Sequence, residues 1–109
     1  MSYLYDFDID TTDDILKVLA ENFQKRRLEK GLSRKMLSQM SGVPAPSIAR
    51  FEQQHAISLG SFVALAKALG YSKDLKELLS QPLYNTMEEL DVINKNKSRK
   101  RGTRRETNK

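Results

Sequence analysis

Apolar residues along the chain recur in short blocks with helical spacing. In the first block they stand four residues apart, which places them on one face of a helix: Ile15, Leu19 and Phe23. Thr11 or Thr12 offers this helix an N-cap, and Gly31 ends it. The next step of four reaches Arg27, so the pattern places a charged side chain on the buried face, where it needs a partner.

The next two predicted helices are short, and a glycine separates them. Ser33 caps the first of them, and its predicted inward residues are Met36, Leu37 and Met40. The other begins at Ala45, since a proline such as Pro46 is tolerated in a first helical turn. Helical spacing directs three of its side chains inward: Ile48, Phe51 and Glu52. The inward positions of Glu52 and Arg27 are most simply explained by one ion pair across the core.

Three more helices complete the predicted fold. One spans residues 59–69, and its inward residues are Leu59, Phe62, Val63, Ala66 and Leu69. The next begins at Asp74, with three inward leucines: Leu75, Leu78 and Leu79. Thr86, with Glu89 three residues later, is a capping-box signature for a last short helix that carries Leu90 and Ile93. The sequence therefore predicts an all-α fold of five to six short helices.

Short helices at this spacing, with Gly42 between the second and the third, are typical of a helix-turn-helix unit. Arg34 and Lys35 stand in the first turn of the second helix, where each positive charge opposes the helix dipole by about 0.3–1 kcal/mol. A stability argument does not explain them, whereas a phosphate bound at that helix end does. The outer face of the third helix carries Pro46, Ala49, Arg50 and Gln53, with Ser47 and Gln54 at its sides.

The net charge changes sign along the chain in four blocks: −5 in residues 1–14, +6 in 15–81, −3 in 82–94 and +7 in 95–109. We predict four segments: an acidic flexible arm (1–11), a helix-turn-helix domain (12–81), a short C-terminal helix (82–94) and a basic disordered tail (95–109). The alternating YDFDID of the arm also suits a short strand that pairs with a second subunit. The basic blocks favour nucleic acid as the partner.

The residue inventory argues against an enzyme. The chain has no cysteine and one histidine, His55, so metal sites built on these residues and nucleophile–base pairs are not expected. The acidic arm has no neighbouring base, which speaks against a carboxylate catalytic pair. No cofactor is expected. The chain has neither a membrane-length apolar run nor a signal-peptide pattern, so we expect it in the cytoplasm, with the nucleoid.

The segment RLEKGLSRKMLSQMSGVPAPSIARFE resembles the Xre family of phage-repressor-type helix-turn-helix regulators, and SFVALAKALGY is similar to the fourth helix of that fold. The resemblance covers about residues 14–80. It implies a dimer that binds operator DNA, with an ion pair between Arg27 and Glu52. It also implies phosphate contacts from Ser33, Arg34 and Lys35, base-edge contacts from Ala45, Pro46, Ala49 and Arg50, and a backbone contact from Gln53.

The sequence departs from the family pattern at three places. Met36 replaces the usual acidic residue of the second helix, so a full capping box is lost. The first turn of the third helix carries alanine and proline in place of polar readers, and Gln54 stands where a glycine commonly closes that helix. We therefore expect few direct hydrogen bonds to bases, mainly from Arg50, with thymine methyl contacts and DNA shape supplying the rest.

The function that these features predict is a sequence-specific DNA-binding transcriptional regulator, a repressor, which acts as a homodimer on a two-fold operator. Two alternatives remain. The extensions, such as NTMEEL and KNKSRKRG, are similar in style to HipB-like antitoxins, which implies a HipA-like kinase toxin as partner and autoregulation of the operon. The other alternative is an assembly protein that binds double-stranded DNA without sequence preference.

Overall fold

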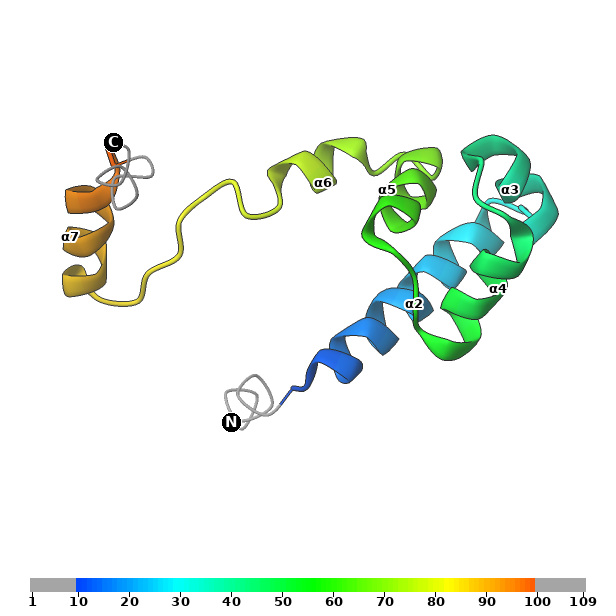
Figure 1. Cartoon of the computed structure of the whole chain (residues 1–109), viewed down its shortest axis with the longest axis horizontal. Helices are drawn as coiled ribbons and strands as arrows, with labels where there is room; N and C mark the ends of the chain where they lie inside the picture. Colours follow the sequence, from blue (N-terminus) through cyan, green and yellow to red (C-terminus); the bar gives the residue numbers. More distant parts are fainter. Residues whose placement is uncertain (1–9, 100–109) are drawn as a thin grey trace, which may run out of the picture. The chain divides into compact units, whose positions relative to one another are not determined.

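A computed structural model describes residues 10–99, which contain six α-helices and no strand (Figure 1). The helices are α2 (Thr12–Glu29), α3 (Arg34–Ser41), α4 (Ala45–Gln54), α5 (Leu59–Ala68), α6 (Ser72–Glu77) and α7 (Met87–Asn96). The predicted all-helical fold class is therefore confirmed. Nearly all of the predicted acidic arm at 1–11, and most of the predicted basic tail at 95–109, lie outside the described residues.

Short polar side chains start the helices as the sequence predicts. Thr11 Oγ1 accepts a hydrogen bond from Asp14 N at 3.0 Å, and the Asp14 carboxylate accepts one from Thr11 N at 3.1 Å, which completes a capping box. Ser33 Oγ accepts from Met36 N at 3.0 Å without a reciprocal partner. At the end of α3, Gly42 takes the left-handed conformation with φ 82°, which a glycine adopts without a Cβ clash.

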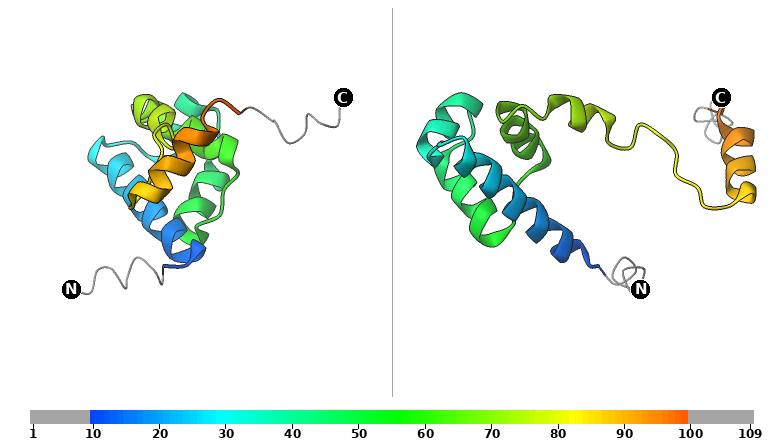
Figure 2. Two further views of the ribbon diagram at one scale, coloured as in Figure 1. Left: turned by 90° about the vertical axis from the view of Figure 1, so that its left-hand side faces the viewer. Right: turned by 180° about the vertical axis from the view of Figure 1, so that it is seen from behind.

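Helices α2 to α5 enclose the hydrophobic core of the first unit of the chain, which ends at Lys76. α2 packs against α4, and α3 packs against α4 and α5 (Figure 2). The buried core side chains are Ala20, Phe23, Leu37, Val43, Ile48, Phe51, Leu65 and Leu69. Phe51 lies at their centre, with its ring centroid 5.3 Å from Phe23 and 5.8 Å from Phe62 in edge-to-face or tilted contacts.

Several residues predicted to face inward are exposed instead. They are Ile15, Leu19, Met36, Met40, Leu59, Val63, Leu78 and Leu79. On α2 the first buried side chain is Ala20, because the first two turns of this 18-residue helix extend beyond the elements packed on it. On α5 the buried face is centred on Leu65, which the sequence pattern missed, so that Leu59 and Val63 fall outside it.

The remaining helices differ from prediction at their ends. α6 begins at Ser72, two residues before the predicted start at Asp74, and α7 runs two residues past 94. The chain divides after Lys76 into a second unit, which contains α7. There Thr86 Oγ1 accepts from Glu89 N at 3.1 Å, whereas the Glu89 carboxylate accepts from Asn85 N at 2.5 Å. The predicted N-cap is present, but the reciprocal bond is made one residue earlier than in a capping box.

Candidate nucleic-acid interface

Helix α4 is the predicted reading helix, and its inner face fixes its orientation. Pro44 stands at the N-cap with an extended ψ of 140°, and no side chain caps the helix. Ile48 and Phe51 are fully buried, with 0% and 1% of their surface exposed. Because both side chains are held in the core, the rotation of α4 about its axis is set, and so is the direction of its opposite face.

The residues that the sequence analysis placed on the outer face of α4 and at its sides are all exposed or half-buried. Pro46, Arg50, Gln53 and Gln54 are exposed, and Ala45, Ser47 and Ala49 are half-buried. Arg50 and the two glutamines supply long hydrogen-bond donors, and Arg is the residue that most often binds guanine in the major groove. The alanines and proline can contact only apolar groups such as thymine methyls. This face therefore suits a readout with few direct hydrogen bonds.

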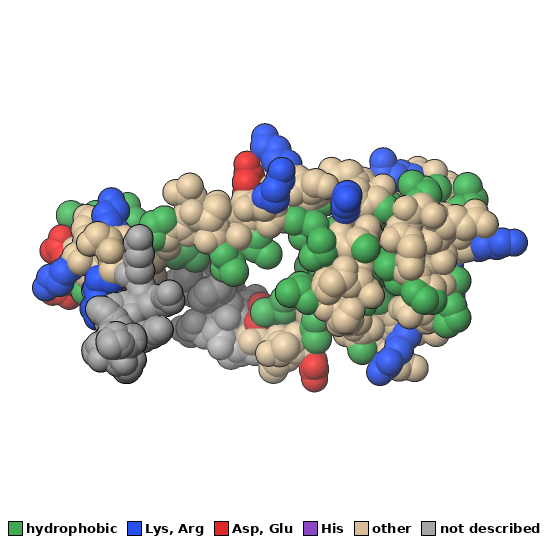
Figure 3. Space-filling model, turned by 45° about the horizontal axis from the view of Figure 1, so that its top comes forward, with side chains coloured by type: hydrophobic (Ala, Val, Ile, Leu, Met, Phe, Trp, Pro, Cys, Tyr) green, Lys and Arg blue, Asp and Glu red, His purple; other side chains and the backbone are tan. Residues whose placement is uncertain are grey.

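The N-terminus of α3 is the second part of the candidate interface. Ser33 caps the helix, Lys35 is exposed, and the first turn contains no acidic residue. Unpaired backbone N–H groups and the helix dipole favour an anion at such a helix end. Figure 3 shows Lys and Arg side chains at several places on the surface of the helix-turn-helix unit.

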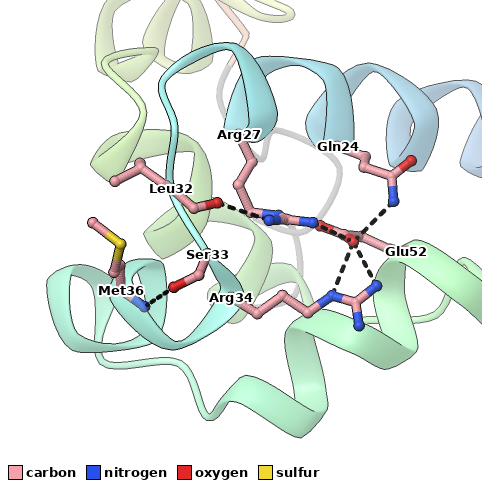
Figure 4. A network of polar contacts seen from close by, with 7 residues as sticks. All are labelled: Gln24, Arg27, Leu32, Ser33, Arg34, Met36 and Glu52. Atoms are coloured by element: carbon pink, nitrogen blue, oxygen red, sulfur yellow. Dashed lines mark hydrogen bonds and ion pairs between the residues drawn. The ribbon is translucent and has the colours of Figure 1, made fainter.

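Glu52 connects the two parts of the interface through an ion-pair network (Figure 4). Arg27 Nε lies 2.6 Å from Glu52 Oε2, and its Nη2 lies 2.9 Å from Oε1. Arg34, the first residue of α3, reaches the same Oε1 with Nε at 3.1 Å and Nη2 at 2.9 Å. Gln24 Nε2 donates to Oε1 at 3.2 Å, and Arg27 Nη1 donates to the carbonyl oxygen of Leu32 at 2.8 Å. One carboxylate thus joins α2, α3 and α4.

The network keeps Glu52 ionised although its side chain is only 1% exposed. Burial by itself raises the pKa of Glu52. The hydrogen bonds from Arg27 and Arg34, together with their positive charges, outweigh burial, so that the pKa of Glu52 lies below its ordinary value. The carboxylate is therefore charged at neutral pH, and the three ionised groups leave one net positive charge.

Arg34 takes a position that the sequence analysis did not foresee. The sequence predicts a free guanidinium at the start of α3 that binds phosphate, whereas the structure directs its Nε and Nη2 to Glu52. The Arg34 side chain is still 32% exposed, in contrast to 7% for Arg27. The surplus positive charge of the network thus lies on the partly exposed side, at the N-terminus of α3.

Two further residues of the network were missed. Gln24 stands three residues before Arg27, one helical turn earlier on the same face, and this spacing was the available signal. Leu32 contributes a backbone carbonyl, for which a sequence offers no signal. Met36 and Met40, which were predicted in the core, are 46% and 56% exposed and lie one turn apart on the outside of α3.

His55 ends α4 in an unusual backbone conformation. It adopts φ 61° and ψ 32°, the left-handed region, and its N–H donates to the carbonyl oxygen of Phe51 at 2.9 Å. Glycine commonly occupies such a helix end because it has no Cβ to clash. His55 therefore acts as the helix C-cap here.

Residues 10–99 contain no group of three His, Asp or Glu side chains that could bind a metal ion. Within the same residues, no helix combines the length and the hydrophobicity that crossing a membrane requires.

A family model described as helix-turn-helix matches residues 23–76, which contain the whole ion-pair network and α3 to α5. The fold and this match support one class of protein, a helix-turn-helix DNA-binding regulator. The match supports membership of the Xre-type family that the sequence resembles. No curated protein and no solved structure was found to match the chain.

Proposed function

We propose that this protein is a sequence-specific transcriptional repressor that acts in the cytoplasm as a homodimer on a two-fold operator. The observation that carries the proposal is the rigid outer face of α4, with Arg50 exposed on it and Ile48 and Phe51 fixed in the core beneath. α4 would lie in the major groove, with the Ser33–Lys35 turn of α3 on the phosphate backbone.

The side chains of α3 and α4 suit different parts of the DNA, the phosphates and the base edges. Lys35 is a flexible point charge, which suits a phosphate and gives no base discrimination. Arg34 carries the surplus charge of the Glu52 network to the same helix end, where it can meet a phosphate while it stays tied to α4. Arg50 is the donor best placed for a guanine edge.

The test is a footprint of the native promoter at a low and a high salt concentration. We expect one protected site with two-fold symmetry. The same site should be protected at the higher salt concentration once the protein concentration is raised to compensate for weaker binding. Protection that spreads over the whole fragment and vanishes with rising salt would instead support the non-specific assembly role.

A HipB-like antitoxin is the second candidate. The observation that favours it is the number of exposed large apolar side chains in residues 78–92, which a protein partner could cover: Leu78, Leu79, Leu83, Tyr84, Met87 and Val92. Purification from the native cell under mild conditions tests this role. Recovery of a kinase in a fixed ratio would support it, and recovery of the chain without another protein would count against it.

A further inference from the structure

The outer side of the first turn of α4 is apolar. Pro44 is the N-cap, and Ala45 and Pro46 are the first two helical residues, so these three positions carry no side-chain donor or acceptor. The N–H groups of Ser47 and Ile48 both donate to the carbonyl oxygen of Pro44, at 2.9 and 3.2 Å. The two prolines have no N–H group. A molecule that approaches this turn from outside therefore meets mainly C–H groups.

The apolar surface continues into the second turn and ends beside an arginine. Pro46 is exposed, and helical spacing places Ala49 and Arg50 next to it, three and four residues later. Ala49 is half-buried, and a methyl group is its whole side chain. Pro46 and Ala49 together are called the α4 patch below. A guanidinium that can donate two parallel hydrogen bonds thus borders a patch whose side chains can make none.

The charges around the α4 patch favour DNA as the molecule that covers it. Residues 33–55 include three basic residues, Arg34, Lys35 and Arg50, of which Lys35 and Arg50 are exposed. The acidic residue of the same segment is Glu52, whose side chain is 1% exposed and bound to two arginines. No exposed carboxylate within residues 33–55 would therefore repel phosphates, and the positive charges attract a polyanion.

The base edges of the major groove offer the patch one kind of apolar group, the C5 methyl group of thymine. Cytosine carries a hydrogen at C5 and, beside it, an N4 amino group that needs an acceptor. The side chains of Pro46 and Ala49 contain no acceptor, so they offer that amino group no partner. 5-Methylcytosine has its methyl group on the same carbon as thymine. The α4 patch can cover either methyl group, and it has no group that distinguishes the O4 of thymine from the N4 of 5-methylcytosine.

We propose that the α4 patch binds the C5 methyl group of a pyrimidine, and that it accepts 5-methylcytosine as well as thymine. Methylation of cytosine at C5 therefore strengthens binding wherever that base meets the patch. Because Arg50 lies one helical turn from Pro46, the methylated pyrimidine stands in the same base pair as the guanine that Arg50 binds, or in the neighbouring pair. This assignment rests on the proposed function: it names the base chemistry that α4 reads and makes DNA methylation a regulator of that reading.

The first experiment selects binding sites of the full chain from random double-stranded DNA. Three libraries are copied from one random pool with different pyrimidines: thymine and cytosine, deoxyuridine and cytosine, or thymine and 5-methylcytosine. Uracil pairs as thymine does and lacks only the methyl group. In the site enriched from the first library, we expect a thymine in each half-site at which uracil weakens binding about fourfold, the effect of one buried methyl group. Uracil effects within about twofold at every thymine would overturn the proposal.

The second experiment places cytosine and then 5-methylcytosine at the thymine position that the first experiment finds, each opposite guanine. Binding to the methylated duplex should be about fourfold tighter than binding to the unmethylated one. A cytosine outside the contacted positions is the control, and its methylation should change the dissociation constant by less than about twofold. Equal binding of the methylated and unmethylated duplexes would show that the patch does not take 5-methylcytosine.

Protein variants assign the methyl effect to the α4 patch. Pro46→Ser replaces the ring with a hydroxyl group, so the ratio of affinities for methylated and unmethylated DNA should fall towards one. Ala49→Ser tests the same ratio if Pro46→Ser does not fold. Lys35→Gln is the matched control, because loss of a phosphate contact should weaken binding to both duplexes and leave their ratio unchanged. A wild-type ratio in the serine variants would place the methyl contact elsewhere and overturn the proposal.

The libraries also separate this inference from the proposed function. One enriched sequence whose affinity ignores the pyrimidine methyl groups would leave the regulator standing and remove the α4 patch as a methyl-binding site. Libraries that enrich no sequence would remove the sequence-specific regulator and, with it, the base contact of the patch.

Discussion

Arg34, the first residue of α3, binds Glu52 of α4 through two guanidinium nitrogens, at 3.1 and 2.9 Å. The same carboxylate is held by Arg27 from α2 at 2.6 Å, so the two helices of the helix-turn-helix are joined by charge as well as by apolar packing. Arg27 is almost completely buried, whereas Arg34 is partly exposed. Replacement of Arg27 and replacement of Arg34 should therefore have different effects on stability and on DNA binding.

Replacement of Arg27 should destabilise the fold strongly. Arg27→Met leaves the buried Glu52 with one charged partner, the partly exposed Arg34, and with the amide of Gln24, and it leaves the Leu32 carbonyl without its donor. Loss of one member of a buried pair typically costs about 3–5 kcal/mol, and we expect the lower end because Arg34 remains. Denaturant unfolding followed by circular dichroism measures it. The double variant Arg27→Met with Glu52→Leu should be less destabilised than the single one; a double variant that is clearly worse would show that the pair itself is needed.

Replacement of Arg34 should affect DNA binding more than stability. Arg34 is partly exposed and Glu52 in Arg34→Gln keeps its bonds to Arg27, so the loss of unfolding free energy should be clearly smaller than for Arg27→Met. The loss of the surplus charge at the start of α3 should weaken binding to every DNA sequence alike and reduce the salt slope by about one ion. Lys35→Gln is the matched control, since its exposed side chain has the same charge and no tie to Glu52. If Arg34→Gln unfolds the domain as Arg27→Met does, the distinction between the two arginines is wrong.

The lowered pKa of Glu52 predicts an acid-dependent loss of stability. A carboxylate whose pKa is lower in the folded state binds fewer protons than in the unfolded state, so its contribution is fully present above its ordinary value of 4.5 and is lost as the pH falls through the lower folded pKa. We expect the melting temperatures of wild type and Glu52→Gln to differ most at neutral pH and to converge as the pH falls below 4.5. Thermal unfolding monitored at a series of pH values from neutral to strongly acidic would check it. A difference that stays constant with pH would contradict the electrostatic role of Glu52.

Arg50 should carry sequence discrimination. A bidentate contact between Arg and guanine contributes about 1–3 kcal/mol of discrimination against the wrong base, and Arg50 is the exposed arginine of the α4 outer face. Arg50→Ala should therefore weaken binding to the operator much more than binding to unrelated DNA, as measured by competition titration at fixed salt. Lys35→Ala provides the comparison, because it should weaken both equally. Equal loss on both DNA molecules in Arg50→Ala would assign Arg50 to the phosphates.

The sequence was informative where a local rule governs the structure. Helix starts followed from Thr11, Ser33 and Thr86, because capping depends on a few neighbouring residues. The spacing of four residues along the first helix predicted that Arg27 faces inward, and Arg27 is buried in the structure. Burial was less predictable, since a helical stripe such as Ile15 is covered only where another element reaches it.

The candidate site shows the same limit. The outer face of α4 was predictable from spacing alone, because its inner face has strong apolar residues. The turn of Arg34 toward Glu52 was not, since it depends on how α3 and α4 pack, which helical spacing does not encode. Met36 and Met40 were misplaced for a related reason: an eight-residue helix has room for few buried positions, and Leu37 fills that role.

The left-handed end of α4 offers a final prediction, on stability. His55 adopts φ 61°, a region where a side chain other than glycine is strained by roughly 1–2 kcal/mol. His55→Gly removes that strain, while the greater freedom of glycine in the unfolded chain returns part of the gain, at about 0.4–1 kcal/mol. We therefore expect the free energy of unfolding to rise by a fraction of a kcal/mol to about 1 kcal/mol. Gly42→Ala is the opposite control, because Gly42 has φ 82° and alanine there should destabilise the chain. Denaturant midpoints of the two variants measure both effects, and a lower midpoint for His55→Gly would show that the imidazole makes a stabilising contact that outweighs the strain.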